Sequence, residues 1–132
     1  MISQMFVNLP VKDLKKTMAF FDRLGFGFDP RFTNEDAACM VIGKNIYCML
    51  LRRERFKEYI PDTSICDATK QTEVMVALRC ESRARVDEYL RQAVAAGGTT
   101  FRPDEDHGFM YARAFKDLDG HIWEVFWMKA DQ

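Results

Sequence analysis

The sequence predicts an α+β fold made of two βαβββ modules in tandem, and two observations lead to this prediction. The first is an internal repeat: segment 7–13 resembles segment 76–82, and an amphipathic stretch follows each. The second is that turn residues divide the rest of each half into short, strand-like segments. We expect one domain over 1–132, with module one at about 3–52, a connector at 53–71 and module two at about 72–129.

In module one, residues 5–9 are predicted to form a strand that ends at Pro10. Asp13 suits the N-cap of a helix, because its side chain accepts a hydrogen bond from an N–H in the first turn. Apolar residues then recur at helical spacing until Gly25 ends the helix. Three more strands, separated by polar turns, are expected at 26–29, 37–42 and 46–52.

The connector has no counterpart in the other half, and residues 54–59 within it are predicted to form a short helix closed by Pro61. Module two opens with a strand at 74–80. Ser82 then caps a helix that ends at the Gly97-Gly98 pair. The remaining strands are expected at 100–102, 109–116 and 122–128.

Composition narrows the classes of function. The chain has a formal net charge of -1, and its basic residues are dispersed, so we expect no nucleic-acid partner. Apolar runs stay short of the roughly 18 residues that span a bilayer, so no membrane partner is expected either. The four cysteines form no CxxC pair and no signal-peptide pattern precedes them, which indicates reduced thiols in a cytoplasmic protein.

Alternation along the strands predicts which residues share a sheet face. One face is heavily apolar and is expected to pack on the helices, whereas the other is expected to contact a ligand. The residues assigned to the second face are Phe6 with Asn8, Ile46 with Cys48, Met75 with Ala77, and Ile122 with Glu124 and Phe126.

Two motifs give the chain a recognisable pattern. The opening motif is Val7-x-Leu9-x-Val11-x-Asp13 followed by Phe20-Phe21-x-x-Leu24-Gly25-Phe26, and the closing motif is Phe115-x-Asp117-x-Asp119-Gly120-x-x-x-Glu124. With the doubled module, these motifs resemble the vicinal oxygen chelate superfamily, which includes glyoxalase I, bleomycin-resistance proteins and extradiol dioxygenases. The chain looks most like a glyoxalase-related branch. The resemblance implies that the modules curve into a cup-shaped mixed sheet, with the helices outside.

The resemblance also implies a ligand site with an unusual composition. Metal-dependent members bind a divalent ion through two histidines and a glutamate, often with a fourth ligand. Here the histidine positions fall on Phe6 and Met75, Glu124 remains, and Cys48 approximates the fourth position. A catalytic divalent site needs about three protein ligands, and phenylalanine supplies no lone pair. We therefore expect no metal and no other cofactor.

Glu124 is the predicted catalytic residue. A carboxylate in a hydrophobic strand requires a partner, which is either a ligand or a pairing with Arg79, Arg113 or a backbone donor. The residues predicted to bind the substrate all lie on strands that the resemblance places around the cup. They are Phe6, Asn8, Cys48, Met75, Tyr111 and Arg113.

Three functions remain open on the sequence. The preferred one is a glyoxalase-like protein that binds a small, partly apolar molecule in the cup, acting as a metal-free lyase or isomerase with Glu124 as the base. The second is a metal-dependent lactoylglutathione-lyase-like enzyme or dioxygenase in which His107 or His121 serves as a ligand. The third is a drug-binding or resistance protein without turnover. Family habit also implies a homodimer.

Overall fold

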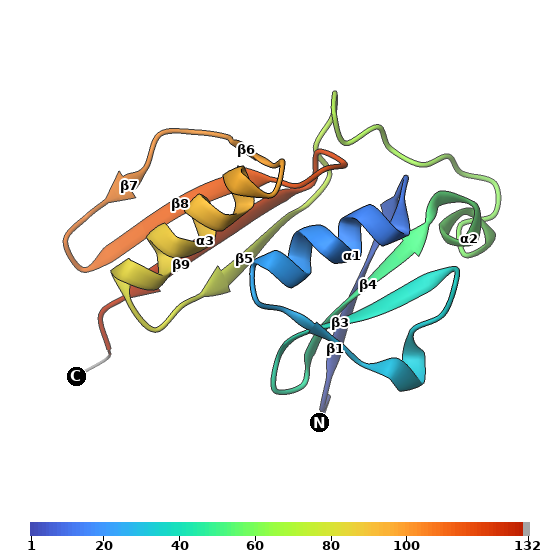
Figure 1. The fold of residues 1–132 in the computed structure, drawn as a ribbon, viewed down its shortest axis with the longest axis horizontal. Coiled ribbons are helices and arrows are strands. Elements are labelled where there is room, and N and C mark those ends of the chain that lie inside the picture. Colours follow the sequence, from blue (N-terminus) through green and yellow to red (C-terminus); the bar gives the residue numbers. More distant parts are fainter. Residues whose placement is uncertain (131–132) are drawn as a thin grey trace. The chain divides into compact units, whose positions relative to one another are not determined.

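The structure is a computed structural model that describes residues 1–130 of the chain. The chain divides into two compact units, Met1–Ile65 and Cys66–Gln132, here called unit 1 and unit 2. Each unit has its own sheet, and the longest helix of the unit lies against it (Figure 1). Each unit thus has two layers that enclose a hydrophobic core.

Unit 1 contains a four-stranded mixed sheet with the strand order β1-β4-β3-β2. Its strands are β1 (Met5–Val11), β2 (Gly27–Phe28), β3 (Ala37–Gly43) and β4 (Ile46–Arg52). Its helical segments are α1 (Leu14–Arg23), the 3-10 turn η1 (Pro30–Phe32) and α2 (Arg53–Glu58). β1 and β4 are parallel, and the other neighbouring strands are antiparallel. The first and last strands of the module therefore lie side by side.

Unit 2 repeats this arrangement with the strand order β5-β9-β8-β6, and β7 pairs with β8 as well. Its elements are β5 (Met75–Arg79), α3 (Arg83–Ala95), β6 (Thr99–Thr100), β7 (Glu105–Asp106), β8 (Met110–Lys116) and β9 (Ile122–Met128). β5 and β9 are parallel, as β1 and β4 are in unit 1. The predicted α+β class and the two tandem βαβββ modules are confirmed.

Local capping explains where the two long helices begin and end. The Asp13 side chain accepts a hydrogen bond from the backbone N–H of Lys16 at 3.1 Å, and Ser82 accepts one from Arg85 at 3.1 Å. Each thereby satisfies a first-turn donor that has no partner inside the helix. At the other ends, Gly25 and Gly97 have φ values of 98° and 109°. Glycine adopts this left-handed conformation without steric cost, so the chain leaves each helix there.

Three details of the strands differ from the prediction. The strand expected at 100–102 is β6 at Thr99–Thr100, so Arg102 lies outside it. β1 continues through Pro10 to Val11, and Pro10 is in register with Leu51 of β4. Proline is tolerated because β1 is an edge strand of its sheet, so the missing N–H can face away from β4. The short strand β7 was not predicted, because two acidic residues carry no hydrophobic alternation.

The core of each unit lies between its helix and one sheet face. In unit 1, α1 buries Leu14, Thr17, Phe20 and Phe21. In unit 2, α3 buries Val86, Leu90 and Ala93, and the sheet contributes the buried Phe115, Trp123 and Val125. Apolar burial of this kind is the main favourable term in folding. None of the helices in residues 1–130 is long and apolar enough to cross a membrane.

A tight turn joins β8 to β9 and is organised by Asp117, which is 5% exposed. Its carboxylate accepts hydrogen bonds from the backbone N–H groups of Asp119 and His121, and from the indole Nε1 of Trp123 at 2.9 Å. Burial raises the pKa of the Asp117 carboxyl. Gly120 completes the turn at φ 89°, where a Cβ atom would lie 2.9 Å from the carbonyl oxygen of Ala68.

We expect Asp117→Asn to destabilise the protein, because an amide has one acceptor oxygen and cannot accept from all three donors. A buried donor without a partner costs about 1–3 kcal/mol, so the free energy of unfolding should fall by that amount in urea titrations. Asp22→Asn, at an exposed helical position, is the matched control and should change it by less than about 0.5 kcal/mol. Equal effects of the two substitutions would contradict the role assigned to the turn.

Candidate functional site

Strand register decides which side chains of unit 1 lie on the sheet face that α1 leaves open. Phe6 of β1 is beside Tyr47 of β4, and Asn8 is beside Met49. Side chains beside each other on paired strands project from the same face. The Phe6 and Tyr47 rings confirm this, because they stack with centroids 4.6 Å apart. We call this the open face of unit 1.

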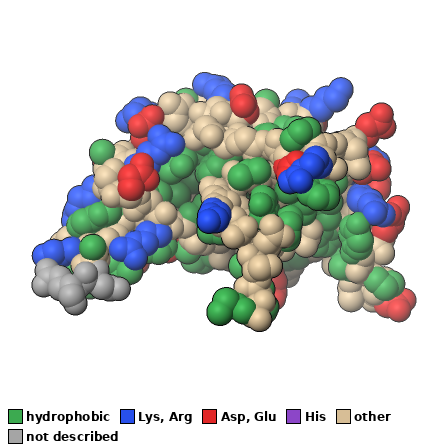
Figure 2. Space-filling model, turned by 90° about the horizontal axis from the view of Figure 1, so that it is seen from below, with side chains coloured by type: hydrophobic (Ala, Val, Ile, Leu, Met, Phe, Trp, Pro, Cys, Tyr) green, Lys and Arg blue, Asp and Glu red, His purple; other side chains and the backbone are tan. Residues whose placement is uncertain are grey.

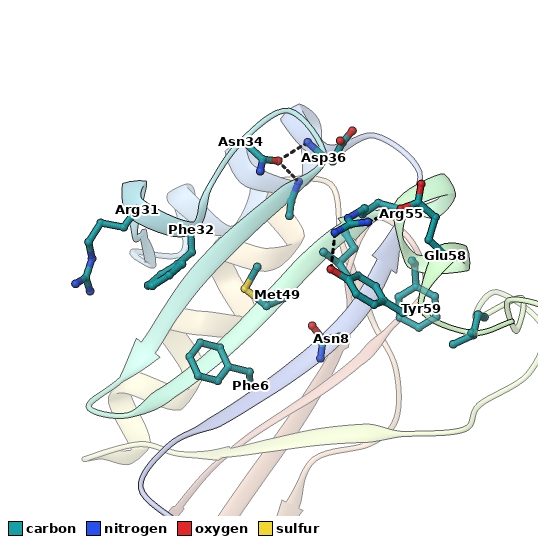
Figure 3. A pocket seen from close by; sticks show the side chains of 14 residues that line it. Phe6, Asn8, Arg31, Phe32, Asn34, Asp36, Met49, Arg55, Glu58 and Tyr59 are labelled. Atoms are coloured by element: carbon teal, nitrogen blue, oxygen red, sulfur yellow. Dashed lines mark hydrogen bonds and ion pairs between the residues drawn. The ribbon is translucent and has the colours of Figure 1, made fainter.

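The open face forms the floor of a hollow of about 1110 Å³. The floor carries Phe6, Asn8 and Met49, while η1 contributes Phe32 and the α2 region contributes Phe56 and Tyr59 (Figure 3). The other lining residues are Arg31, Asn34, Asp36, Ala37, Leu51, Arg55, Glu58 and Ile60. The hollow therefore combines an apolar and aromatic lining with charged groups.

The charged groups around this hollow are paired. Arg31 donates to Asp29 from Nε at 3.1 Å and from Nη2 at 2.8 Å, and these hydrogen bonds lower the pKa of Asp29. Arg55 pairs with Glu58, donates to the Tyr59 hydroxyl at 2.7 Å and places its guanidinium over the Tyr59 ring. Because each arginine already has a carboxylate partner, neither needs an anion from a ligand.

Asn8 is the polar group on the floor. Its side chain is exposed, and among residues 1–130 it makes no hydrogen bond to another side chain or to the backbone. An amide offers two N–H donors and one acceptor oxygen. Asn8 is therefore available to a ligand that carries one polar group, in line with its predicted substrate-binding role.

In unit 2, the open face of the sheet carries Glu124. It lies on β9 between Ala77 of β5 and Ala114 of β8. Its carboxylate pairs with the guanidinium of Arg102, and the two side chains are 21% and 23% exposed. Of the partners proposed from the sequence, Arg79 donates instead to the carbonyl oxygen of Met128 at 3.0 Å. The partner of Glu124 is thus an arginine that the sequence did not single out.

Met75 is the other predicted site residue on this face. It lies beside Ile122, two positions before Glu124 on β9, and it is 45% exposed. Phe6, its counterpart in unit 1, is 41% exposed on the open face of that unit. Both large apolar side chains are thus exposed on the open faces of their units.

The assignment of Cys48 to the ligand-facing side is wrong. Cys48 is beside Val7 on β1 and Met40 on β3, and it is fully buried on the face that packs on α1. The cause is a shift of one residue in the alignment of the two modules. In the structure, Met49 is beside Asn8 as Glu124 is beside Ala77, so Met49 is the counterpart of Glu124. A shift of one residue moves a side chain to the opposite face.

Tyr111 and Arg113 also lie on the helix-facing side, where they are beside Trp127 and Val125. The Tyr111 hydroxyl donates to Asp87 of α3 at 2.6 Å, and Arg113 donates to Asp87 at 3.0 Å and to Asp104 at 2.9 Å. Burial, followed by the bond to Asp87, raises the pKa of Tyr111 to about 12. These groups hold α3 and residue 104 against β8, and they do not share a face with Glu124.

The residues present do not fit a divalent metal site. Within residues 1–130 there is no cluster of three or more His, Cys, Asp or Glu side chains that could hold an ion. Glu124 is already paired with a cation, and His107 lies in an exposed hairpin 3.6 Å from Glu105. Phe6 and Met49 offer no hard donor atom. The expectation that no metal is bound stays a prediction.

Sequence reasoning missed three contributors. Arg102 was expected at the end of a strand at 100–102 and precedes a proline, so nothing local marked it as the partner of Glu124. Phe56 and Tyr59 belong to the connector, which was set aside because it has no counterpart in module two. An aromatic pair in a short amphipathic helix was the available signal.

The surface carries charges of both signs between exposed apolar groups. On the face shown in Figure 2, basic and acidic side chains are mixed, and hydrophobic side chains lie between them. The exposed large hydrophobic residues include Met5, Phe32, Ile46, Tyr59 and Phe109.

Comparison with known proteins supplies the family context. Residues 4–43 match the bleomycin resistance protein-like N-terminal family. No relative among curated proteins matches the chain.

Solved structures match nearly the whole chain. A hypothetical protein, SA1046 from S. aureus, is 29% identical with a TM-score of 0.78, covering 96% of this chain and 94% of its own. A glyoxalase-related enzyme from Fulvimarina pelagi is 20% identical with a TM-score of 0.77, over 96% and 88%. The fosfomycin resistance protein FosX from Listeria monocytogenes is 23% identical with a TM-score of 0.68, over 96% and 94%. Together with the two βαβββ units, these similarities show that the chain has a glyoxalase-like fold.

Proposed function

We propose that this protein binds a small, partly apolar molecule against the open face of unit 1, without the help of a metal ion. The observation that carries the proposal is the hollow of about 1110 Å³ above Phe6, Asn8 and Met49. Binding sites for small molecules combine apolar and aromatic walls with a few placed polar groups, and this hollow has that composition.

The lining favours a neutral ligand with a flat ring. Phe32 and Tyr59 come from segments on opposite sides of the strands that form the floor, so a ring has aromatic surfaces available on both sides (Figure 3). The arginines around the hollow are paired with carboxylates, whereas the Asn8 amide has unused donors and an acceptor. A molecule with one aromatic system and one amide or carbonyl group matches these features.

The catalytic form of the proposal assigns a base to Glu124, as a lyase or isomerase would require. A carboxylate of this kind can remove a proton from a carbon next to a carbonyl group. Arg113 is not available to stabilise the resulting enolate, because it faces α3 and is bound to Asp87. Arg102 contacts Glu124 directly, and in this proposal it is the residue that stabilises the enolate.

Sequestration without turnover is the second candidate. It is favoured by the match of residues 4–43 to the bleomycin resistance protein-like N-terminal family. That segment includes Phe6, Asn8 and Phe32, which line the hollow. The two candidates differ in whether Glu124 acts as a base.

Removing the aromatic walls should weaken binding. With 2-naphthamide as the probe, we expect Phe32→Ala and Tyr59→Ala each to raise the dissociation constant about five- to ten-fold, because an aromatic contact contributes about 0.5–1.5 kcal/mol. Both residues are more than half exposed, so the fold should tolerate the changes. Isothermal titration calorimetry measures the constants.

Phe109→Ala is the matched control, because Phe109 is 59% exposed, belongs to unit 2 and is not among the residues that line the hollow. It should leave the affinity for 2-naphthamide unchanged, and hexanamide should bind more weakly than 2-naphthamide to all variants. The assignment of the hollow is contradicted if Phe109→Ala weakens binding as much as the two wall substitutions do.

Glu124→Gln separates catalysis from sequestration. If Glu124 is a base, exchange of the carbon-bound protons of dihydroxyacetone in D₂O, followed by NMR, should slow by about 100-fold or more in this variant. Binding of 2-naphthamide should not change. Glu88→Gln, at an ion-paired position on α3, is the control and should behave as the wild type. Absence of exchange in the wild type would favour the sequestering function.

The proposal includes a homodimer. β1 and β5 are edge strands of their sheets, and each therefore has one side that pairs with no strand of its own unit. Exposed edges of this kind favour association with another chain. Light scattering after gel filtration should give twice the chain mass of 15.4 kDa. A mass equal to one chain at micromolar concentration would rule the dimer out.

A further inference from the structure

The surroundings of Glu124 are built to receive a bulky cation. Both sheet neighbours of Glu124 are alanines, Ala77 and Ala114, and Ala114 is 2% exposed. Small side chains on both sides leave room above the sheet for the guanidinium of Arg102. Arg102 reaches Glu124 across β8, because its own segment lies along the far edge of that strand.

The segment that carries Arg102 is attached to β8 on both sides. Before it, Thr100 pairs with Phe115, and after it, Glu105 pairs with Ala112. Asp104 is also held by Arg113 at 2.9 Å. The position of Arg102 is thus fixed by backbone pairing and by an ion pair, which distinguishes it from an arginine on a mobile surface loop.

The burial of Arg102 also indicates that this residue is positioned as the partner of Glu124. Its side chain is 23% exposed, and its Nε atom is buried without a hydrogen-bond partner among the described residues. Leaving a guanidinium N–H without an acceptor costs free energy. An arginine with no role beyond the surface could point into water and keep all its N–H groups hydrogen-bonded. Arg102 instead leaves its Nε unsatisfied, because its guanidinium compensates the charge of the half-buried Glu124.

We propose that Arg102 is the resident cation of unit 2: its guanidinium occupies the place beside Glu124 that a divalent ion would need, and it excludes such ions. This inference rests on the metal-free function proposed above and names the residue that enforces it. Two positive groups cannot share one carboxylate without strong repulsion in a half-buried site. Loss of Arg102 should therefore free Glu124 as a metal ligand.

The test introduces a second ligand next to Glu124 and compares variants with and without Arg102. Met75→His places an imidazole on the same face, two positions from Glu124 along the paired strands. By calorimetry with ZnCl₂, the double variant Met75→His/Arg102→Gln should bind Zn²⁺ about ten-fold or more tightly than Met75→His alone. Circular dichroism verifies that each variant is folded.

Two further variants serve as controls, one for the positive charge at position 102 and one for the removal of an arginine elsewhere. Met75→His/Arg102→Lys keeps a positive charge, so its Zn²⁺ affinity should stay within about three-fold of that of Met75→His. Met75→His/Arg91→Gln removes an exposed arginine on α3 and should change nothing. If the affinity for Zn²⁺ is the same, or equally undetectable, with Arg102 and without it, the inference is overturned.

The proposed function can fail independently of this inference. Stoichiometric metal in wild-type protein, measured by elemental analysis, would overturn both the exclusion by Arg102 and the metal-free function. If Phe32→Ala and Tyr59→Ala do not weaken the binding of 2-naphthamide, only the assignment of the hollow in unit 1 is overturned. A metal-free wild type with a strong effect of Arg102→Gln supports the inference, whatever the hollow binds.

Discussion

The pairing of the first and last strands within each unit is the interaction on which the rest of the structure depends. β1 pairs with β4, and β5 pairs with β9, in parallel and over their whole common length. The register of these pairs decides which residues face the helix and which face the open side. It puts Trp123 and Val125 in the core and leaves Glu124 between them on the other face. A shift of one residue in this register would bury the Glu124 carboxylate and expose the Trp123 side chain.

Features that depend on local sequence were predictable, and those that depend on register were not. Asp13 and Ser82 cap their helices as expected, because capping involves residues at most a few positions apart. The face of Cys48 was assigned wrongly, since it depends on which residue of β1 lies beside it. Arg102 was missed because its partner Glu124 is distant in sequence, and no local pattern marks such a pair. Alternation placed Phe6, Asn8 and Glu124 on the sheet faces that the helices leave open, and the strand register agrees; their roles stay predictions.

The two faces of the unit 2 sheet use charged residues in different ways. On the helix face, Arg113 and Tyr111 converge on Asp87 of α3, and Arg83 pairs with Asp106 of β7. These contacts supplement the apolar packing of α3 on the sheet, so they serve the fold. Charged groups engaged in this way have few donors or acceptors left for a ligand. On the open face, among the described residues, Glu124 and Arg102 form such a pair. Replacing Arg102 as the partner of Glu124 would change the chemistry of that face.

Under the proposal that Arg102 is the resident cation of unit 2, Met75 and Arg102 are linked. Met75 cannot hold a divalent ion beside Glu124 as an imidazole could, so the carboxylate needs another cation to offset its charge. A half-buried carboxylate without a counter-charge is destabilising. A guanidinium restores the balance and needs no further ligands, because it brings its charge within its own side chain. In this proposal the Arg102 guanidinium balances Glu124 on a face that carries the Met75 thioether, and the alanines on both sides of Glu124 provide the space that the guanidinium requires.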